Sequence, residues 1–125
     1  MNEYIDKNMF ETIHTEKKRL LRQLSKRTIK NFMDILVLSE LKRAPMSGYD
    51  VISLIFDKFN FLPSSGSVYS LLYALERDQF IEGEWSGRKR VYALTAKGEE
   101  MVEMALALHA TIENLMTSIF GDFFL

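Results

Sequence analysis

Residues 64–95 read SSGSVYSLLYALERDQFIEGEWSGRKRVYALT, and this stretch decides the fold. It opens with small polar residues of the kind that begin helices. An apolar stripe at helical spacing follows, formed by Val68, Leu71, Leu72 and Leu75. Two runs rich in aromatic and β-branched residues, 80–85 and 90–94, then predict strands on either side of the turn Ser86-Gly87. A helix followed by a hairpin with a cationic tip suits a duplex with a groove and charged walls, and it does not have the layout of a catalytic site.

Two further helices are predicted upstream of this stretch. Residues 31–43 are apolar on nearly every side, which indicates a buried central helix that Ala44-Pro45-Met46 ends. Ser47 and Asp50 form a Ser-x-x-Asp capping pattern, so the next helix starts there and runs to about Lys58. Its inward-facing side chains are predicted to be Val51, Ile52, Ile55, Phe56 and Phe59. A turn at residues 60–63 leads into the third helix.

Charge is distributed unevenly near the start of the chain. Residues 17–30 hold seven lysines and arginines and no acid, with Leu20, Leu21 and Leu24 at helical spacing. This pattern predicts an amphipathic basic helix. It is either a solvated face that covers the core, or an arm that contacts phosphates or embraces a partner subunit.

The last helix is predicted to begin after Thr95, with Gly98 as a weakness in its first turn. An apolar seam then recurs at alternating steps of four and three residues. The seam consists of Met101, Ala105, Leu108, Ile112, Leu115 and Ile119. Because the chain already has a core, a helix this apolar needs a partner, and we expect a homodimer.

Bulk properties bound the remaining possibilities. The 125 residues suggest one domain, and the net charge of -1 means that any nucleic-acid binding depends on local clusters of cations. Cysteine is absent, which excludes disulfides and thiolate chemistry and fits a reducing compartment. No apolar run is long enough to span a bilayer. The start of the sequence lacks the pattern of a signal peptide, so we expect a cytoplasmic protein.

The predicted fold is mainly α with a small β-hairpin wing: a winged helix-turn-helix with an N-terminal basic helix and a C-terminal dimerisation helix. The predicted divisions are residues 1–28 for the basic extension, 29–95 for the winged helix-turn-helix and 96–125 for the dimerisation helix. Several separated motifs in this order carry a resemblance. They are Ser47-Gly48-Tyr49, Ser65-Gly66-Ser67-Val68-Tyr69, Leu75-Glu76, and the run from Arg88 to Gly98.

Together these motifs resemble the PadR family of bacterial and archaeal transcriptional regulators, in the short form that lacks a large C-terminal domain. Two positions depart from the family pattern. Ser70 stands where the family often has proline after the tyrosine, and Asp78-Gln79 stands where it often has glycine. Another residue must therefore make the left-handed cap that glycine provides.

The DNA-binding surface is predicted on the third helix and the wing. Small residues let the helix backbone approach base edges, and hydroxyls donate to or accept from bases and phosphates. The predicted contacts are Tyr49, Ser64, Ser65, Gly66, Ser67, Tyr69, Ser70, Tyr73, Arg88, Lys89 and Arg90, with Lys26 and Arg27 from the basic arm. The resemblance implies a phosphate-facing role for Tyr69. Half-buried packing is the alternative for both Tyr69 and Tyr73, and it is favoured for Tyr73. Strand alternation turns Arg90 away from Lys89, so one of that pair faces away from DNA.

A dimer would present two recognition helices roughly 34 Å apart and read a pseudopalindromic operator, most simply as a repressor. The resemblance also implies a cavity at the dimer interface for a planar aromatic effector. Candidate linings are Trp85, Met101, Met104, His109, Met116 and Phe120. Ordinary core packing is the favoured alternative for these side chains. No cofactor and no metal are expected.

Three other classes of protein compete with a regulator. An enzyme is disfavoured, because there is no nucleophile or phosphate-loop motif and His14 and His109 have no triad partners. A protein-binding winged helix would show an acidic or apolar third helix, whereas this one is polar. A DNA-binding dimer that senses nothing, acting as a terminator or architectural protein, stays open.

Overall fold

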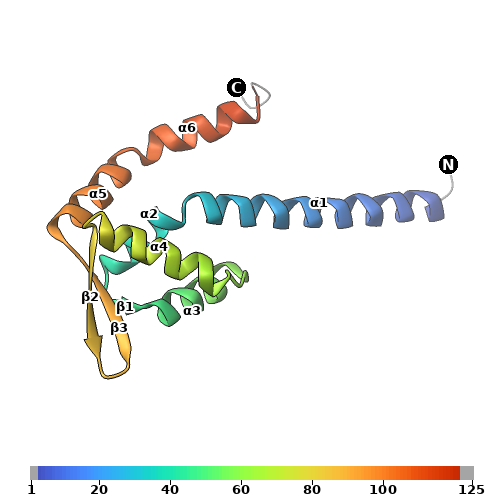
Figure 1. Cartoon of the computed structure of the whole chain (residues 1–125). Coiled ribbons are helices and arrows are strands. Elements are labelled where there is room, and N and C mark those ends of the chain that lie inside the picture. The colour runs from blue at the N-terminus through green and yellow to red at the C-terminus, as the bar shows by residue number, and fades with distance from the viewer. Residues whose placement is uncertain (1–2, 122–125) are drawn as a thin grey trace. The chain divides into compact units, whose positions relative to one another are not determined.

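The computed structural model describes residues 3–121, with the backbone alone for residues 3–12. The chain forms two compact units, residues 1–33 and 34–125. Nine helices and strands follow one another in the described residues (Figure 1). The last four residues of the predicted C-terminal helix lie outside this range.

Helix α1 (Glu3–Asn31) makes up almost all of the first unit. Residues 3–31 contain neither glycine nor proline, so nothing in the backbone interrupts the helix. The prediction of a basic helix over residues 17–30 is confirmed, although the helix starts well before that segment.

Three helices open the second unit: α2 (Met33–Leu41), α3 (Gly48–Phe59) and α4 (Ser65–Arg77). The predicted capping box before α3 is confirmed, because Asp50 N donates to Ser47 Oγ (3.2 Å) and Ser47 N donates to Asp50 Oδ2 (3.0 Å). The hydrogen bonds from Ser47 lower the pKa of the Asp50 carboxyl.

The sheet has three antiparallel strands where the sequence predicted a two-stranded wing. Strands β2 (Ile81–Ser86) and β3 (Lys89–Leu94) form the hairpin, with Glu84 opposite Val91. The additional strand β1 (Met46–Ser47) pairs with β3, so the order is β1-β3-β2. β1 escaped the sequence analysis because two residues are too short for an alternating pattern.

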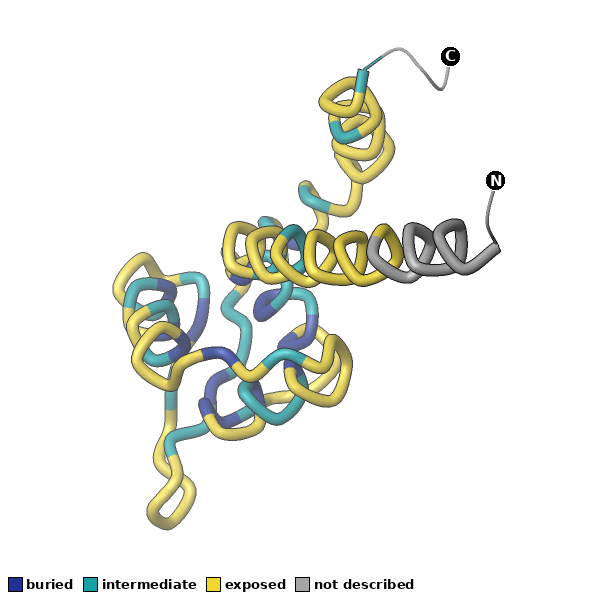
Figure 2. The backbone as a smooth tube through the Cα atoms, turned by 90° about the vertical axis from the view of Figure 1, so that its right-hand side faces the viewer, coloured by how far each residue is buried: buried dark blue, intermediate teal, exposed yellow. Residues whose placement is uncertain are grey.

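The core of the second unit joins the helices to the base of the wing (dark blue segments in Figure 2). The residues predicted for the stripe of α4 are mostly buried, with Val68 and Leu72 inaccessible to solvent. The core consists of Val37, Leu38, Leu41, Val51, Ile55, Val68, Leu72, Leu75, Ile81, Tyr92 and Val102. The prediction that Phe56 and Phe59 face inward is wrong: both lie on the outer side of α3 and are exposed.

The predicted single C-terminal helix is two helices, α5 (Ala96–Ala107) and α6 (His109–Ile119). Thr95 caps α5 as predicted, since its Oγ1 accepts from Gly98 N (3.1 Å). The break falls at Leu108, whose N–H is shared between the carbonyls of Met104 and Ala105 in a locally tightened turn. Neither proline nor glycine stands at the break, so residue type alone does not predict it.

Candidate DNA interface

The N-terminus of α4 is a row of small, exposed polar residues. Ser64 is the N-cap, and its Oγ accepts from Ser67 N (3.1 Å). The Ser64 hydroxyl also donates to Ser67 Oγ (2.7 Å). A Cβ on Gly66 would meet no atom within 4 Å, so the protein's own packing does not demand glycine there. Ser65, Gly66, Ser67 and Ser70 are all exposed, which leaves this end of α4 open to a close approach.

Tyrosines from two helices gather beside this row. Tyr69 is half-buried against Gly48, where a Cβ would overlap the tyrosine ring. Glycine at position 48 therefore lets α3 approach α4 closely enough to seat Tyr69. Tyr73 is one turn further along α4, with its ring centroid 6.3 Å from that of Tyr69. The favoured interpretation of Tyr73 as a half-buried packing group is wrong, since Tyr73 is 59% exposed.

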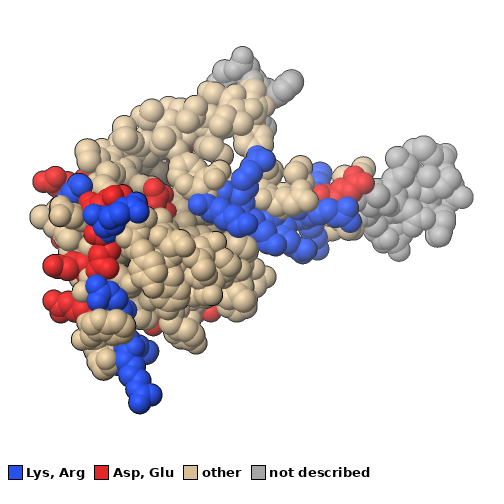
Figure 3. Space-filling view, viewed as in Figure 1, with Lys and Arg blue, Asp and Glu red and all other residues tan. Residues whose placement is uncertain are grey.

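The hairpin carries the cations to its tip. Gly87 adopts a left-handed conformation (φ 64°), which makes the tight turn possible. Arg88 and Lys89 are exposed at the tip, which forms the blue extension at the bottom of Figure 3. These two cations are available to an incoming polyanion.

Arg90 is held by the protein itself. Its Nη2 donates to Glu76 Oε2 of α4 at 2.7 Å, and this bond raises the pKa of the Arg90 guanidinium. The guanidinium also lies 5.6 Å from the centroid of the Trp85 ring and 5.9 Å from that of Tyr92. Arg90 thus faces α4, as the alternation along β3 predicted for one of the two neighbouring cations.

Glu76 connects α4 to both strands of the wing. Besides Arg90 on β3, its Oε2 accepts from Gly83 N on β2, also at 2.7 Å. A Cβ on Gly83 would lie 2.6 Å from Arg90 Nε and 2.9 Å from Glu76 Oε2, so the arrangement requires glycine or a shift of both side chains. Glu76 and Gly83 were not predicted from the sequence as positioning residues. The alternation at Arg90 was the one signal that pointed toward them.

These groups enclose a groove of about 430 Å³ between α4 and the wing. Burial in its floor, followed by the charge of Glu76, raises the pKa of Tyr92. The lining consists of Ser47, Gly48, Tyr49, Tyr69, Tyr73, Trp85, Arg88, Lys89, Arg90 and Tyr92. Hydroxyls, aromatic rings and cations on a concave surface match the sugar–phosphate backbone of a nucleic acid.

The structure therefore brings together six of the predicted contacts, Tyr49, Tyr69, Tyr73, Arg88, Lys89 and Arg90, in one groove. Lys26 and Arg27 are exposed on α1, in the other unit. On α5 and α6 the predicted seam is half-buried at Met101 and Ala105 and exposed from Leu108 onward. Of the candidate effector linings, Trp85 lies in the groove beside α4, whereas Met104, His109 and Phe120 are exposed and thus not core of the single chain.

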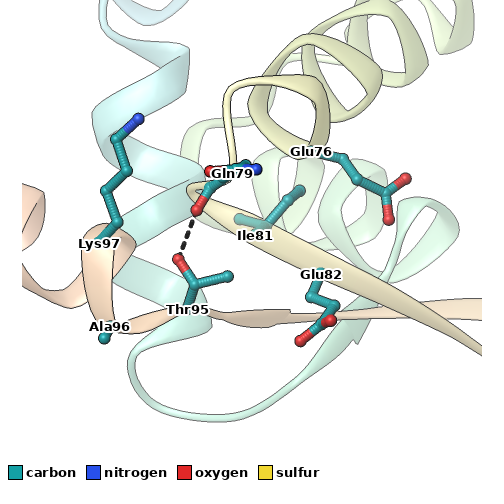
Figure 4. Close-up of a pocket in the computed structure, with 7 residues that line it drawn as sticks. All are labelled: Glu76, Gln79, Ile81, Glu82, Thr95, Ala96 and Lys97. Atoms are coloured by element: carbon teal, nitrogen blue, oxygen red, sulfur yellow. Dashed lines mark hydrogen bonds between the residues drawn. The ribbon is translucent and has the colours of Figure 1, made fainter.

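A second hollow, at the C-terminal end of α4, is a structural joint (Figure 4). Gln79 takes the left-handed conformation (φ 66°) that the sequence required of some residue there. Phe80 N donates to Leu75 O (2.9 Å) and Gln79 N to Glu76 O (3.0 Å), which is a Schellman motif. Thr95 Oγ1 donates to Gln79 O (2.6 Å) and Lys97 Nζ to Asp78 O (2.8 Å).

No group of three or more potential metal-ligating side chains occurs among the described residues. Within residues 3–121, no helix has the length and apolar character needed to cross a bilayer.

A helix-turn-helix that packs with a small three-stranded sheet, two strands of which form a protruding hairpin, defines a winged-helix protein. The model of the transcriptional regulator PadR-like family matches residues 37–104, more than half of the chain. The chain belongs to this family of transcriptional regulators. A comparison with curated protein sequences found no match.

Solved structures share the fold. A PadR-family transcriptional regulator from Eggerthella lenta is 18% identical, with a TM-score of 0.71 over 86% of this chain and 98% of its own. The winged-helix DNA-binding protein F93 from STIV is 24% identical, with a TM-score of 0.56 over 67% of this chain and 91% of its own. Bacillus subtilis PadR, crystallised in complex with operator DNA, is 23% identical, with a TM-score of 0.50 over 59% of this chain and 45% of its own.

Proposed function

We propose that this protein is a dimeric, sequence-specific DNA-binding regulator that acts as a repressor. The observation that carries the proposal is the groove beside α4, which four tyrosines and the exposed cations Arg88 and Lys89 line, next to the polar, small-residue N-terminus of that helix. Family membership and the operator complex of Bacillus subtilis PadR support it.

In this proposal α4 enters the major groove with its N-terminal half toward the bases. Ser65 and Ser67 reach base edges or phosphates, and Gly66 admits the DNA backbone. The N-terminal amides of α4 face a phosphate. Arg88 and Lys89 hold the backbone on one side of the groove or enter an adjacent minor groove.

Dimerisation is proposed to occur through α5 and α6. α6 has no buried residue, yet Leu108, Ile112, Leu115 and Ile119 are exposed large apolar side chains at alternating steps of four and three. A second copy of the chain would cover this seam and repeat the recognition helix one turn of duplex away.

Repression follows most simply from occupancy. Two recognition helices and two wings on one pseudopalindrome exclude other proteins from that stretch of DNA. A reporter gene placed behind the bound site should be expressed less when the protein is present. Higher expression would assign activation instead.

Footprinting on the DNA that surrounds the protein's own gene tests the central claim. A discrete protected site with two symmetric halves is the expected result. Uniform coverage at the same concentrations would favour the architectural alternative, and absence of protection in low salt would favour a protein-binding winged helix.

A further inference from the structure

The basic segment of α1 lies outside the residues that the family model matches. Residues 17–30 contain seven of the sixteen lysines and arginines of the chain and none of its seventeen acids. The rest of the chain is therefore strongly acidic, and only this segment and the wing tip concentrate positive charge. In Figure 3 the blue side chains run along α1 as a continuous band.

The cations of α1 do not surround the helix evenly. Successive residues of an α-helix are rotated by about 100°, so Lys18, Arg19, Arg22, Lys26 and Lys30 fall within an arc of about 120°. We name these five residues the cation face. Arg27 lies outside this arc. Of the two DNA contacts predicted on the arm, Lys26 and Arg27, only Lys26 therefore belongs to the cation face.

Between residues 13 and 31, most apolar side chains of α1 lie away from the cation face, whereas Ile29 falls inside its arc and is half-buried. Ile13, Leu20 and Leu24 centre about 160° from the middle of the cation face, and Leu21 lies about 120° from it; Ile13, Leu20 and Leu21 are exposed. The two interpretations of the arm, as a phosphate-contacting or a dimer-embracing element, therefore concern different faces of one helix. Protein contacts made by the apolar side leave the cation face toward solvent.

We infer that the cation face is a second DNA-binding surface, which holds the phosphate backbone without reading sequence. From Lys18 to Lys30 it extends over about 18 Å, a length along which one strand of duplex presents about five phosphates. The inference rests on the proposed function, because the partner it invokes is the duplex that α4 and the wing engage.

A lipid surface is the other polyanion that a basic amphipathic helix binds. The apolar side of α1 is poorly suited to it, because Lys17 stands among Ile13, Leu20 and Leu24 and interrupts the apolar surface. The aromatic residues in and next to α1 are Tyr4, Phe10 and Phe32, and none of them falls within the segment 17–30 that carries the cations. Duplex DNA is therefore the partner that the observations favour.

The test measures binding to a mixed-sequence duplex several helical turns long, over a range of salt concentrations. The variant Arg22→Gln/Lys30→Gln removes two positive charges from the cation face. The control variant Lys17→Gln/Lys42→Gln also removes two positive charges, but from positions outside that face. Glutamine has a helix propensity close to that of lysine and arginine, and circular dichroism checks that α1 stays folded. Each lost phosphate contact reduces the salt slope by about 0.9.

The face variant should bind DNA at least several-fold more weakly and with a smaller salt slope, while the control pair stays within about twofold of wild type. Equal losses of DNA affinity in the two variants would show that only the overall charge matters, and would overturn the inference. Unchanged DNA affinity of the face variant would overturn it as well. The wing variant Arg88→Gln/Lys89→Gln separates the two claims. If it loses binding and the face variant does not, the proposed function stands and the second surface fails.

Vesicles of phosphatidylcholine and phosphatidylserine provide the last arm of the test. The wild-type protein should stay in the supernatant when they are sedimented. If the wild-type protein sediments with the vesicles and the face variant does not, the cation face binds a lipid surface, and the assignment to DNA is overturned.

Discussion

Replacing Glu76 by alanine should weaken DNA binding although it makes the protein more positive. Glu76 Oε2 accepts from Gly83 N and from Arg90 Nη2, both at 2.7 Å, and so fixes both strands of the wing to α4. Electrostatics alone predicts that losing an acid beside a DNA-binding groove strengthens binding. If Glu76 positions the wing, the loss of alignment dominates and binding falls.

The expected loss of stability follows from the Gly83 amide alone. Leaving a partly buried donor without its acceptor costs about 1–3 kcal/mol. For a unit of this size, about 1 kcal/mol lowers the Tm by roughly 4–8 °C, so a decrease near 10 °C is expected for Glu76→Ala. Glu76→Gln keeps an oxygen for Gly83 N but loses the charge that Arg90 binds, so its effect should be smaller.

Thermal unfolding and DNA titration of three variants test this reasoning. Glu82→Ala is the matched control, because it removes an equally charged, exposed side chain from β2 and should stay within about 0.5 kcal/mol of wild type. Glu76→Ala should also have a smaller effect in an Arg90→Ala background, because the two residues share one bond. Unchanged stability together with tighter DNA binding by Glu76→Ala would refute the positioning role.

Three further predictions concern single positions. Gln79→Gly should raise the free energy of unfolding by about 0.5–1 kcal/mol, because a non-glycine residue holds the left-handed cap of α4; a decrease in urea-denaturation midpoint would contradict this. Gly66→Ala should leave stability unchanged or slightly higher, since its Cβ meets nothing, yet weaken operator binding more than tenfold; wild-type affinity would show that DNA does not approach there. Asp50→Ala should destabilise the protein by about 1 kcal/mol at neutral pH through loss of the capping box. The pKa of Asp50 is lower in the folded than in the unfolded protein, so this contribution is present above the unfolded-state pKa and disappears as pH falls through the folded-state value. A difference between Asp50→Ala and wild type that persists at the lowest pH at which both stay folded would argue against it.

The sequence predicted the parts of the fold that depend on local pattern. The stripe of α4, the capping box at Ser47, the Thr95 cap and the hairpin turn each follow from residue types at short spacing. The exposed position of Phe56 escaped prediction, because helical periodicity gives the direction of a stripe and not its width. The break at Leu108 left no local signal of any kind.

Three glycines are required by contacts that the local sequence pattern does not predict. Gly98 is a predicted weakness of the last helix, and the structure shows why glycine stands there. A Cβ there would overlap the carbonyl oxygen of Phe80, so glycine is what lets α5 pack against the start of the wing. Gly48 and Gly83 likewise admit Tyr69 and Arg90. Such requirements come from residues distant in sequence, which one chain without its fold does not reveal.

The joint between α4 and α5 has a mechanical consequence. The hydrogen bonds from Thr95 to Gln79 and from Lys97 to Asp78 hold the C-terminal end of α4 to the first turn of α5. In a dimer assembled through the C-terminal helices, α4 and α5 would then move as one rigid unit that pivots about the contact between the two copies. A small change in the angle at which two copies cross would be magnified at the far ends of the recognition helices. Tuning that angle would shift the preferred spacing between operator half-sites without altering any residue that touches a base.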